Sequence, residues 1–432
     1  MALDNKVSAI CGGPGVGKTV TSIEILRCAV EAGLKVKVMA PTGKAASRIA
    51  EAIISSNYKS IENIIPTTIH RGLDWVMQDD TDTEGFPRRD EEHPIVADLL
   101  LIDESSMIDN SLMANLLLAV SPETKLIFVG DPDQLPPVGP GQPYIDLLDS
   151  GKIPFYQLLD VWRQAKGSKI WLACQAIREQ SPYDFYKYAT KDGDEIAFNA
   201  LSDSAEIKRF FSKALKRFVE SGSDPYNNLQ ILTPVREKGD ASMVSLNTLC
   251  AKIVNPNKSS GILLGANGIG RPGDKVIQTK NNYRRLVFNG DQGKIRTSGL
   301  QSLQIETRRR KQKLITWSRW PQPEDTQIPL SINSLGVDLA GQYLPYTEAE
   351  AASELMLSYA LTIHRFQGSQ SPHVGLACPV EAWSMMGRRL LLTAVSRARS
   401  RIVLAGPVEV VTKAITTDRD ASRRTGLKEK LQ

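Results

Sequence analysis

Hydrophobic runs alternate with amphipathic stretches through the first 160 residues of the chain. This alternation predicts a parallel sheet whose strands are joined by crossover helices. The segments expected to form strands, each ending in a polar or glycine-rich turn, are 7–11, Val36–Ala40, Leu99–Ile102 and 126–129. In a doubly wound sheet, ligands bind where the strands end. We therefore expect one α/β domain over residues 1–160, with its site at these turns.

A second α/β pattern follows the first. Helical periodicity at 170–178 and 207–219 precedes a strand at Leu229–Thr233, and the pattern resumes at Leu355 and closes with a strand at 401–405. The sequence thus predicts a second α/β domain built from 161–271 and 351–432.

Two segments interrupt this alternation. Residues 72–96 contain a polar stretch that is too long for an ordinary connection and has no apolar period. Residues 272–350 show short alternating runs and several prolines, which indicates a small β-rich insertion. The expected organisation is therefore two α/β domains, each with one insertion.

Composition narrows the class of protein. The 432 residues include 53 Lys and Arg against 48 Asp and Glu, so the net charge of +5 excludes a polybasic binder that works by bulk charge. No run approaches the length of a membrane span, and the N-terminus lacks the features of a signal peptide, so the chain is expected to be neither secreted nor anchored. Its five cysteines are scattered and include no Cys-x-x-Cys pair, which favours a reducing, cytoplasmic location.

A phosphate-binding loop is the strongest chemical signal. The letters GGPGVGKT satisfy G-x-x-x-x-G-K-[ST] directly after a predicted strand and before a predicted helix. Its glycines let backbone N–H groups surround the β-phosphate of ATP, Lys18 reaches the β and γ oxygens, and the Thr19 hydroxyl ligates Mg²⁺. The alternative, a glycine-rich turn without a ligand, explains fewer of these residues. The predicted nucleotide-binding residues are Gly12, Gly13, Gly15, Val16, Gly17, Lys18, Thr19 and Val20.

Acidic and amide side chains end two further strands. LLLIDESS delivers Asp103, which would hold Mg²⁺, and Glu104, which would orient and deprotonate the water that attacks the γ-phosphate. The next strand runs into DPDQLPPV, where Gln134 can touch the γ-phosphate or the attacking water. An Asp-Glu pair in a solvated turn and a glutamine that only caps backbone groups are the alternatives for these two motifs.

Taken together, these motifs resemble those of superfamily 1 DNA helicases, in particular the RecD-like branch related to the exonuclease V alpha subunit and the phage Dda helicase. The resemblance covers nearly the whole chain, in the order of the family. It is carried by GGPGVGKT, APTGKAASRI, TTIHRGL, LLLIDESSM, GDPDQLPPV, VWRQ, LTPVRE, GDKVIQTKNNY, VFNGDQGKI, YALTIHRFQGSQ and TAVSRAR.

The resemblance implies a second half of the active site. Such helicases hydrolyse ATP between two RecA-like domains of one chain, and Arg163 and Arg397 match the family's two arginines. Both would stabilise charge on the transferred phosphoryl group, although an isolated arginine is more often a surface ion-pair partner. Gly368 occupies a family position close to the nucleotide.

The resemblance also implies a path for single-stranded DNA. Hydroxyl, amide, imidazole and ammonium donors along this path suit contacts to the backbone rather than to base edges. The histidines could equally serve as helix caps or core residues. The residues that match DNA-contacting motifs are Thr42, Gly43, Lys44, Thr67, His70, Thr362, His364 and Gln367.

Both insertions have counterparts in the family. Residues 72–96 lie where RecD-like helicases carry a β-hairpin pin that splits the duplex, with Phe86 as a candidate tip, although an acidic disordered loop is the alternative. Residues 272–350 correspond to an SH3-like subdomain. Its basic run at 308–313, followed by Trp317 and Trp320, could contact nucleic acid or simply form a charged, solvated edge strand.

One feature departs from the family. Family members carry, upstream of the phosphate loop, a helix with a glutamine that reads the adenine edge, and often an additional N-terminal domain. Here Met1 lies only a few residues before the first strand. We expect either a chain that is the C-terminal part of a longer protein or a nucleotide site that is open on the base side.

The sequence therefore predicts an ATP- and Mg²⁺-dependent DNA helicase or single-strand translocase that moves 5′ to 3′ by resemblance. It would act as a monomer on single-stranded and tailed duplex DNA, with nuclease or recombination subunits as possible partners. One alternative is an ATP-gated DNA-binding or loading module without processive unwinding. Another is a ring-forming ATPase that takes its arginine from a neighbour, but Arg163 and Arg397 within one chain argue against it.

Overall fold

A computed structural model describes residues 2–76, 85–158, 167–256, 261–265, 268–282, 285, 287–298, 334–339, 341–419 and 427–431. Its contacts divide the chain into two compact units. Unit 1 combines Met1–Leu249 with Tyr359–Gln432, and unit 2 is Cys250–Ser358.

The N-terminal part of unit 1 is a six-stranded parallel sheet in the order β3-β2-β4-β5-β1-β6. Its strands are β1 (Val7–Gly12), β2 (Val36–Ala40), β3 (Thr67–Thr68), β4 (Leu99–Ile102), β5 (Lys125–Gly130) and β6 (Phe155–Leu158). Because β1, β4 and β5 lie side by side in the order β4-β5-β1, the loops that follow them open at the same edge of the sheet. This edge is where the predicted nucleotide residues converge.

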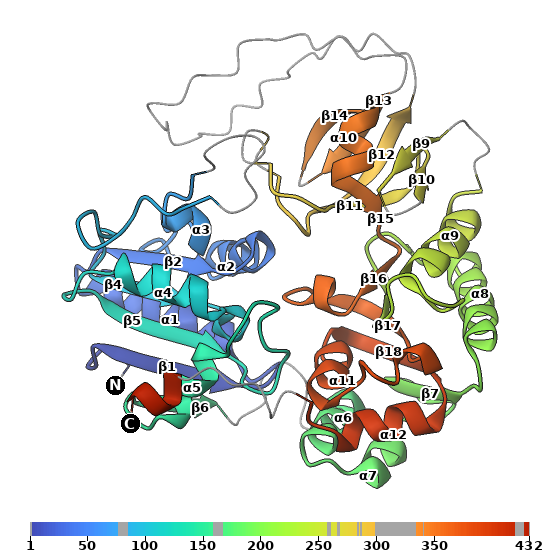
Figure 1. The fold of residues 1–432 in the computed structure, drawn as a ribbon, viewed down its shortest axis with the longest axis horizontal. Coiled ribbons are helices and arrows are strands. Elements are labelled where there is room, and N and C mark those ends of the chain that lie inside the picture. The colour runs from blue at the N-terminus through green and yellow to red at the C-terminus, as the bar shows by residue number, and fades with distance from the viewer. Residues whose placement is uncertain are drawn as a thin grey trace. The chain divides into compact units, whose positions relative to one another are not determined.

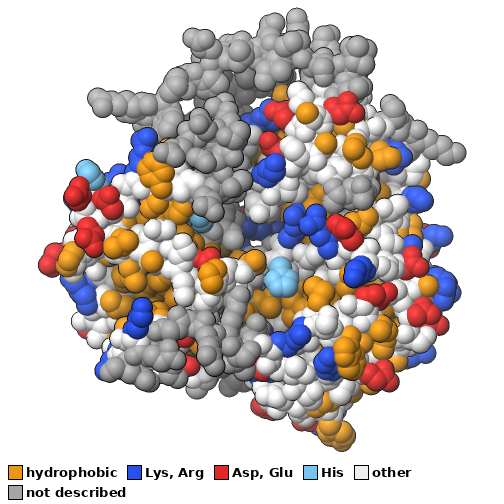
Figure 2. Space-filling view, in the orientation of Figure 1, with side chains coloured by type: hydrophobic (Ala, Val, Ile, Leu, Met, Phe, Trp, Pro, Cys, Tyr) orange, Lys and Arg blue, Asp and Glu red, His pale blue; other side chains and the backbone are white. Residues whose placement is uncertain are grey.

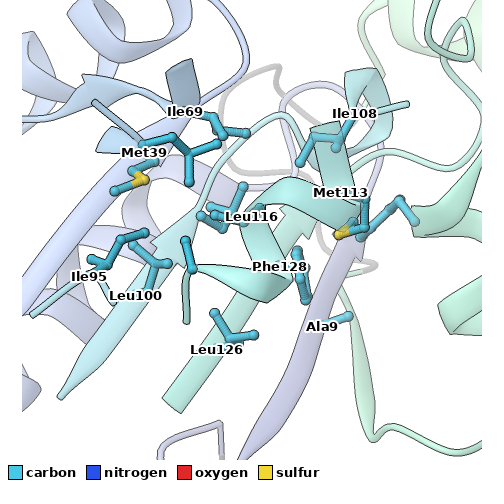
Figure 3. Close-up of a cluster of buried hydrophobic side chains, with 14 of the residues drawn as sticks. Ala9, Met39, Ile69, Ile95, Leu100, Ile108, Met113, Leu116, Leu126 and Phe128 are labelled. Carbon is cyan, nitrogen blue, oxygen red and sulfur yellow. The ribbon is translucent and has the colours of Figure 1, made fainter. Parts of the chain in front are cut away.

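Helices cover both faces of this sheet, and the alternation of side chains along β4 shows why (Figure 1). Leu100 and Ile102 pack into the cluster that contains Met113 and Leu116 of α4, whereas Leu99 and Leu101 pack into the opposite cluster with α1 and α2. Figure 3 shows the first of these clusters. The helices are α1 (Lys18–Glu31), α2 (Gly43–Ser55), α3 (Ile69–Gly72), α4 (Asn110–Leu118) and α5 (Pro143–Asp149).

Side-chain caps fix where several helices begin. Thr42 caps α2 by accepting from the backbone N–H of Ala45, and Asp109 caps α4 by accepting from that of Leu112. These caps satisfy backbone donors that the first helical turn leaves free.

The rest of unit 1 contains a five-stranded parallel sheet in the order β16-β8-β17-β18-β7. Phe211 of α8 packs so closely on β17 that a Cβ atom on Gly375 would lie 2.7 Å from its ring. On the same sheet, α6 and α12 pack against α11, whose residues 390–395 are all buried. The elements are α6 (Lys169–Arg178), α7 (Pro182–Tyr188), β7 (Ile196–Ala200), α8 (Ser204–Glu220), β8 (Leu229–Thr233), β16 (Ala360–Thr362), β17 (Ser371–Ala377), α11 (Arg388–Val395), β18 (Ala398–Gly406), α12 (Val408–Thr416) and α13 (Leu427–Leu431).

Unit 2 is built on an antiparallel five-stranded sheet in the order β14-β13-β12-β11-β15, together with the hairpin β9-β10. It is broader than the insertion predicted at 272–350, because this hairpin, the end of α9 and β15 pack with it. The elements are α9 (Met243–Val254), β9 (Ile262–Leu264), β10 (Gly268–Gly270), β11 (Lys275–Gln278), β12 (Gln292–Ser298), β13 (Ser334–Leu339), β14 (Gln342–Thr347), α10 (Glu348–Glu354) and β15 (Leu355–Leu357). The basic run at 308–313, Trp317 and Trp320 lie outside the described residues.

The predicted strands agree closely with the observed ones. Val36–Ala40, Leu99–Ile102 and Leu229–Thr233 match residue for residue, and β1 and β5 each extend by one or two residues. The predicted fold class, an α/β fold with two parallel sheets, is confirmed. The domain bounds 1–160, 161–271 with 351–432, and 272–350 stay predictions.

Phe86 does not form the tip of the predicted pin. It pairs with Val76 in an antiparallel bridge, and each residue donates its N–H to the carbonyl of the other. The two residues therefore stand opposite each other at the base of the excursion, and 77–84 between them lie outside the described residues.

Across the described ranges, the helices are too short or too polar for any of them to cross a membrane.

Helix α4 offers a matched test of core packing. Leu116 is fully buried, whereas its neighbour Leu117 is 45% exposed. Replacement of Leu116 by alanine should lower the free energy of unfolding by about 2–5 kcal/mol, because it leaves a cavity, whereas Leu117→Ala should cost within about 0.5 kcal/mol. Urea unfolding of both variants measures the difference, and equal losses would contradict the packing described here.

Candidate active site

The loop between β1 and α1 forms the centre of the site. Gly15 and Gly17 adopt φ values of 82° and 92°, in the left-handed region that glycine tolerates best. The Lys18 ammonium donates to the carbonyl oxygens of Gly12 at 2.6 Å and Gly13 at 2.8 Å. The sequence GGPGVGKT therefore closes a loop around its own lysine, at the start of a helix whose first N–H groups favour an anion.

A pocket of about 250 Å³ lies on this loop. It is smaller than pockets that enclose whole drug-sized ligands, roughly 300–1,000 Å³, so its size suits a phosphate chain better than an entire nucleotide. The predicted residues that line it are Gly13, Gly15, Gly17, Lys18, Thr19, Val20, Asp103, Glu104, Gln134 and Arg397. Gly12, Val16 and Gly368 do not line the pocket, and Arg163 lies outside the described residues.

Two adjacent carboxylates follow β4. Burial and the charge of Glu104 together raise the pKa of Asp103 above its ordinary value. Glu104 is 7% exposed and has a positive φ of 51°, an uncommon conformation for a residue other than glycine. Its Oε1 atom accepts from Arg48 Nη1 at 3.4 Å, and its Oε2 atom is without a hydrogen-bond partner among the described residues. The pair is thus a concentration of negative charge with unused acceptor capacity.

The donors around the acidic pair fit a hard cation. Thr19 supplies a hydroxyl and Asp103 a carboxylate to the same pocket, and oxygen ligands are those that Mg²⁺ prefers. Within the described residues, no group of three His, Cys, Asp or Glu side chains forms a cluster able to hold a metal. A cation here would therefore depend on Thr19, Asp103 and the oxygens of its ligand.

The loop after β5 places an amide in the pocket. Gln134 is 3% exposed, and its Nε2 atom donates to Asp131 Oδ2 at 3.0 Å. With the amide nitrogen assigned in this way, the Oε1 atom has no partner among the described residues. Gln134 can therefore accept a hydrogen bond from a ligand or a water molecule.

Arg397 lies between α11 and β18 and is 2% exposed. Its guanidinium donates to the carbonyl oxygens of Thr393 at 3.0 Å and Ser369 at 3.2 Å, and to the Ser396 hydroxyl at 2.9 Å. Burial lowers the pKa of Arg397, but the ordinary pKa of arginine is so high that the guanidinium keeps its charge. The second sheet thus supplies a cation to the pocket.

Arg48 and Gln370 also line the pocket, although sequence reasoning did not single them out. Arg48 contacts Glu104 and also donates to the Gly368 carbonyl at 3.1 Å. The sequence signal for Arg48 is its place in APTGKAASRI, the motif that also contains Thr42 and Lys44. Gln370 ends the motif that contains Gly368, and its Oε1 atom accepts from Arg399 at 3.3 Å.

The first group of predicted DNA-contacting residues lies around the start of α2 and along β3 and α3. Thr42 caps α2, Gly43 is its first residue, and the Lys44 ammonium lies 5.4 Å from the centre of the Phe366 ring. Thr67 is in β3. His70 is half-buried against Trp75 at 4.9 Å, and burial lowers its pKa, so its imidazole is neutral near pH 7.

The second group follows β16. The Thr362 hydroxyl accepts from the N–H of Arg365 at 3.4 Å, and His364 begins a short 3₁₀ helix. Gln367 is 7% exposed, and its Nε2 atom donates to the Leu135 carbonyl at 3.2 Å. The structure therefore places Gln367 inside the protein, against the loop that carries Gln134.

Two parallel sheets that bring a phosphate loop, an acidic pair and an arginine to one pocket define a P-loop NTPase core. The family described as AAA domain matches residues 1–140, and the family described as UvrD-like helicase C-terminal domain matches residues 357–405.

Curated relatives are similar in sequence to nearly the whole chain. The chain is 32% identical over 429 residues to the ATP-dependent RecD2 DNA helicase of Deinococcus radiodurans, an alignment that covers 99% of this chain and 50% of that protein. It is 29% identical to the RecBCD enzyme subunit RecD of Mycobacterium tuberculosis, with 100% and 72% of the two chains covered. These matches confirm the resemblance of the chain to RecD-like helicases of superfamily 1. It spans half the length of the RecD2 relative.

Solved structures support the fold. Bacteroides Pif1 helicase in complex with ADP-AlF3 and ssDNA superposes with a TM-score of 0.52 and 18% identity, covering 96% of this chain and 91% of that one. A second structure, of Bacteroides Pif1 bound to ssDNA, gives 0.53 and 16%, covering 97% and 92%.

The raised pKa of Asp103 predicts a pH-dependent cost to stability. Because the folded protein binds this proton more tightly than the unfolded chain, the associated stability is present below about pH 4 and is lost as pH rises through the folded pKa of about 7. The neutral variant Asp103→Asn should therefore raise the free energy of unfolding at pH 8 by about 1–3 kcal/mol and by less at pH 5. Urea unfolding at both pH values measures this, with the exposed Asp192→Asn as control. A gain that is independent of pH would contradict the assignment.

Proposed function

We propose that this chain is the motor core of an ATP-dependent DNA helicase or single-strand translocase. The observation that carries the proposal is one pocket lined by Lys18, Asp103, Glu104, Gln134 and Arg397. The helicase name of the RecD2 relative, the similarity to the RecD subunit of the RecBCD enzyme, and the Pif1 helicase structure with ssDNA support the same conclusion.

In the proposed reaction, each side chain has one task. Lys18 leaves the loop carbonyls and neutralises the β and γ oxygens of ATP, while Thr19 and Asp103 would hold Mg²⁺, which supplies further charge neutralisation. Glu104 accepts the proton of the attacking water, and Gln134 orients that water through its free Oε1 atom. Arg397, together with Arg163, stabilises the charge that spreads over the transferred phosphoryl group.

The Arg48–Glu104 contact bears on the timing of this reaction. Arg48 Nη1 donates to the Oε1 atom of Glu104 at 3.4 Å, so this oxygen is not open to the attacking water while the contact lasts. We infer that movement of Arg48 away from Glu104 accompanies activation. The bond from Arg48 to the Gly368 carbonyl supplies a competing acceptor for the same guanidinium.

The DNA path is proposed along Thr42, Gly43, Lys44, Thr67 and His70 of the first sheet, and Thr362, His364 and Gln367 of the second. Hydroxyl, ammonium and imidazole donors along this path carry little net charge, as suits a strand that is released in every cycle. The Gln367 amide already donates to the Leu135 carbonyl. A 5′ to 3′ direction is proposed by analogy with the RecD-like relatives.

The accessory segments are assigned by the same analogy. We propose that the excursion at 72–96 is the pin-like insertion. The antiparallel sheet of unit 2 supports an SH3-like subdomain at 272–350. The proposed RecA-like domains are 1–160, and 161–271 with 351–432. Nuclease or recombination subunits are possible partners, and the motor is expected to work as a monomer.

The ATPase test uses matched charge and amide variants. Glu104→Gln should lower kcat by about 10²–10⁴-fold, because the general base is lost, and Lys18→Ala should abolish nucleotide binding. The exposed Glu51→Gln and Lys35→Ala serve as controls and should match the wild type. Phosphate release with and without single-stranded DNA is the measurement. A wild-type protein without DNA-stimulated ATPase activity would overturn the proposal.

A strand-displacement assay separates the motor from its main alternative, an ATP-gated DNA-binding module. We expect unwinding of a duplex with a 5′ single-stranded tail, none with a 3′ tail, and none by Glu104→Gln. ATP-dependent DNA binding without displacement on either substrate would favour the binding module instead. Displacement that requires a 3′ tail would reverse the proposed direction.

A further inference from the structure

Arg178, at the end of α6, reaches from the second sheet's helices to the phosphate loop of the first. Its side chain is 16% exposed, and its Nε atom donates to Asp133 Oδ2 at 3.0 Å. Its Nη2 atom lies 3.6 Å from Asp131 Oδ2 and has no hydrogen-bond partner among the described residues. One guanidinium thus faces both acidic residues of the loop after β5.

The phosphate loop is shaped around the same guanidinium. A Cβ atom on Gly13 would lie 2.4 Å from Arg178 Nη2 and 2.8 Å from Nη1. The phosphate-loop pattern leaves this position open to any residue, and Gly13 does not adopt a positive φ. A methyl group at position 13 would therefore require the Arg178 guanidinium to move.

Asp131 connects Arg178 to Gln134, which lines the pocket. It is a buried carboxylate, 1% exposed, and it accepts hydrogen bonds from Gln134 Nε2 at 3.0 Å and from the N–H of Asp133 at 3.1 Å. Arg178 Nη2 lies 3.6 Å from Asp131 Oδ2, the same oxygen that accepts from Gln134 Nε2. Arg178 therefore borders the carboxylate that holds the Gln134 amide with its Oε1 atom free.

The surrounding charges favour this arrangement. Asp133 is shared between Arg178 and Arg388 of α11, whose Nη1 atom lies 3.7 Å from Asp133 Oδ1. Arg388 also donates to Asp418 at 2.6 Å. Burial alone would lower the pKa of Arg178, but the charges of Asp131 and Asp133 outweigh burial and raise this pKa above its ordinary value. The guanidinium therefore stays charged at any working pH.

We propose that Arg178 is a positioning residue for ATP hydrolysis, which sets the orientation of Gln134 through Asp131 and does not itself touch the nucleotide. This inference rests on the proposed ATPase activity. It assigns to α6 a link between the second sheet and the γ-phosphate end of the pocket.

The kinetic test compares Arg178→Met, Gln134→Ala and the double variant. Arg178→Met should lower the DNA-stimulated kcat by about 10- to 100-fold, because a misplaced group at the reacting end is costly, and should leave KM for ATP within about twofold. The double variant should be no slower than Gln134→Ala, because both changes remove the same interaction. Arg178→Lys, which retains the charge but loses the planar fork, should recover part of kcat.

A matched control separates positioning from general stability. Arg285 in unit 2 is also an ion-paired arginine, 20% exposed, and contacts Glu350 at 2.6 Å. Arg285→Met should keep the wild-type kcat. If Arg178→Met fails to fold, as judged by its thermal unfolding, the same comparison with Arg178→Lys decides the outcome.

Gly13→Ala provides a second, independent readout. The added methyl group displaces the guanidinium, so the change should lower kcat by a larger factor in the wild-type background than in the Arg178→Met background. An equal loss in both backgrounds would contradict the packing argument.

The outcomes distinguish the two levels of inference. An active wild type whose kcat is unchanged in Arg178→Met, or losses that multiply in the double variant, would overturn the role of Arg178 alone. An inactive wild type would overturn the proposed ATPase and this inference with it. A loss in Arg178→Met that appears only in KM would assign Arg178 to nucleotide binding and would also overturn it.

Discussion

The repulsion between two adjacent carboxylates at the end of a buried strand is the constraint on which the rest of this site depends. Strand β4 is fully buried, so Asp103 and Glu104 emerge from it into an environment that disfavours their charges. Three cations from separate elements line the same pocket as these carboxylates: Lys18 from α1, Arg48 from α2 and Arg397 from the second sheet. The site is therefore an assembly of opposed charges that no single element could hold on its own.

The cations are held by neutral groups as much as by the acids. Lys18 is bound by two backbone carbonyl groups, and Arg397 by two carbonyl groups and a hydroxyl. Such bonds keep the cations in place without neutralising them, so their charge remains available to an anion. The positive φ of Glu104 adds local backbone strain of the kind that concentrates at functional sites. Stability is given up at this pocket, and the two clusters of buried hydrophobic side chains on either face of the first sheet offset the loss.

The sequence could predict what depends on local pattern. Strands such as Leu99–Ile102 are predictable because a buried parallel strand is a short apolar run between turns. The phosphate loop is predictable because the spacing of its glycines and lysine determines the shape of the loop. Arg178 escaped prediction, since its function depends on where the end of α6 falls relative to Asp131, which no spacing along the chain encodes. Phe86 is a further example: the sequence suggests it as the tip of the pin, but its bridge to Val76 decides its position. The motif that contains Gln367 likewise does not predict that this side chain is buried against Leu135.

That burial changes how strand binding and hydrolysis could be linked. Gln367, assigned by resemblance to the DNA path, donates to the carbonyl of Leu135, one residue beyond Gln134. Gly368, the next residue, accepts from Arg48, which also holds Glu104. On the proposed function, a movement of this segment on DNA would reach both the orienting amide and the general base through one hydrogen bond each. Coupling then needs no extended pathway, because the two sites share a segment of two residues, and a shift of that segment biases both sides of the pocket together.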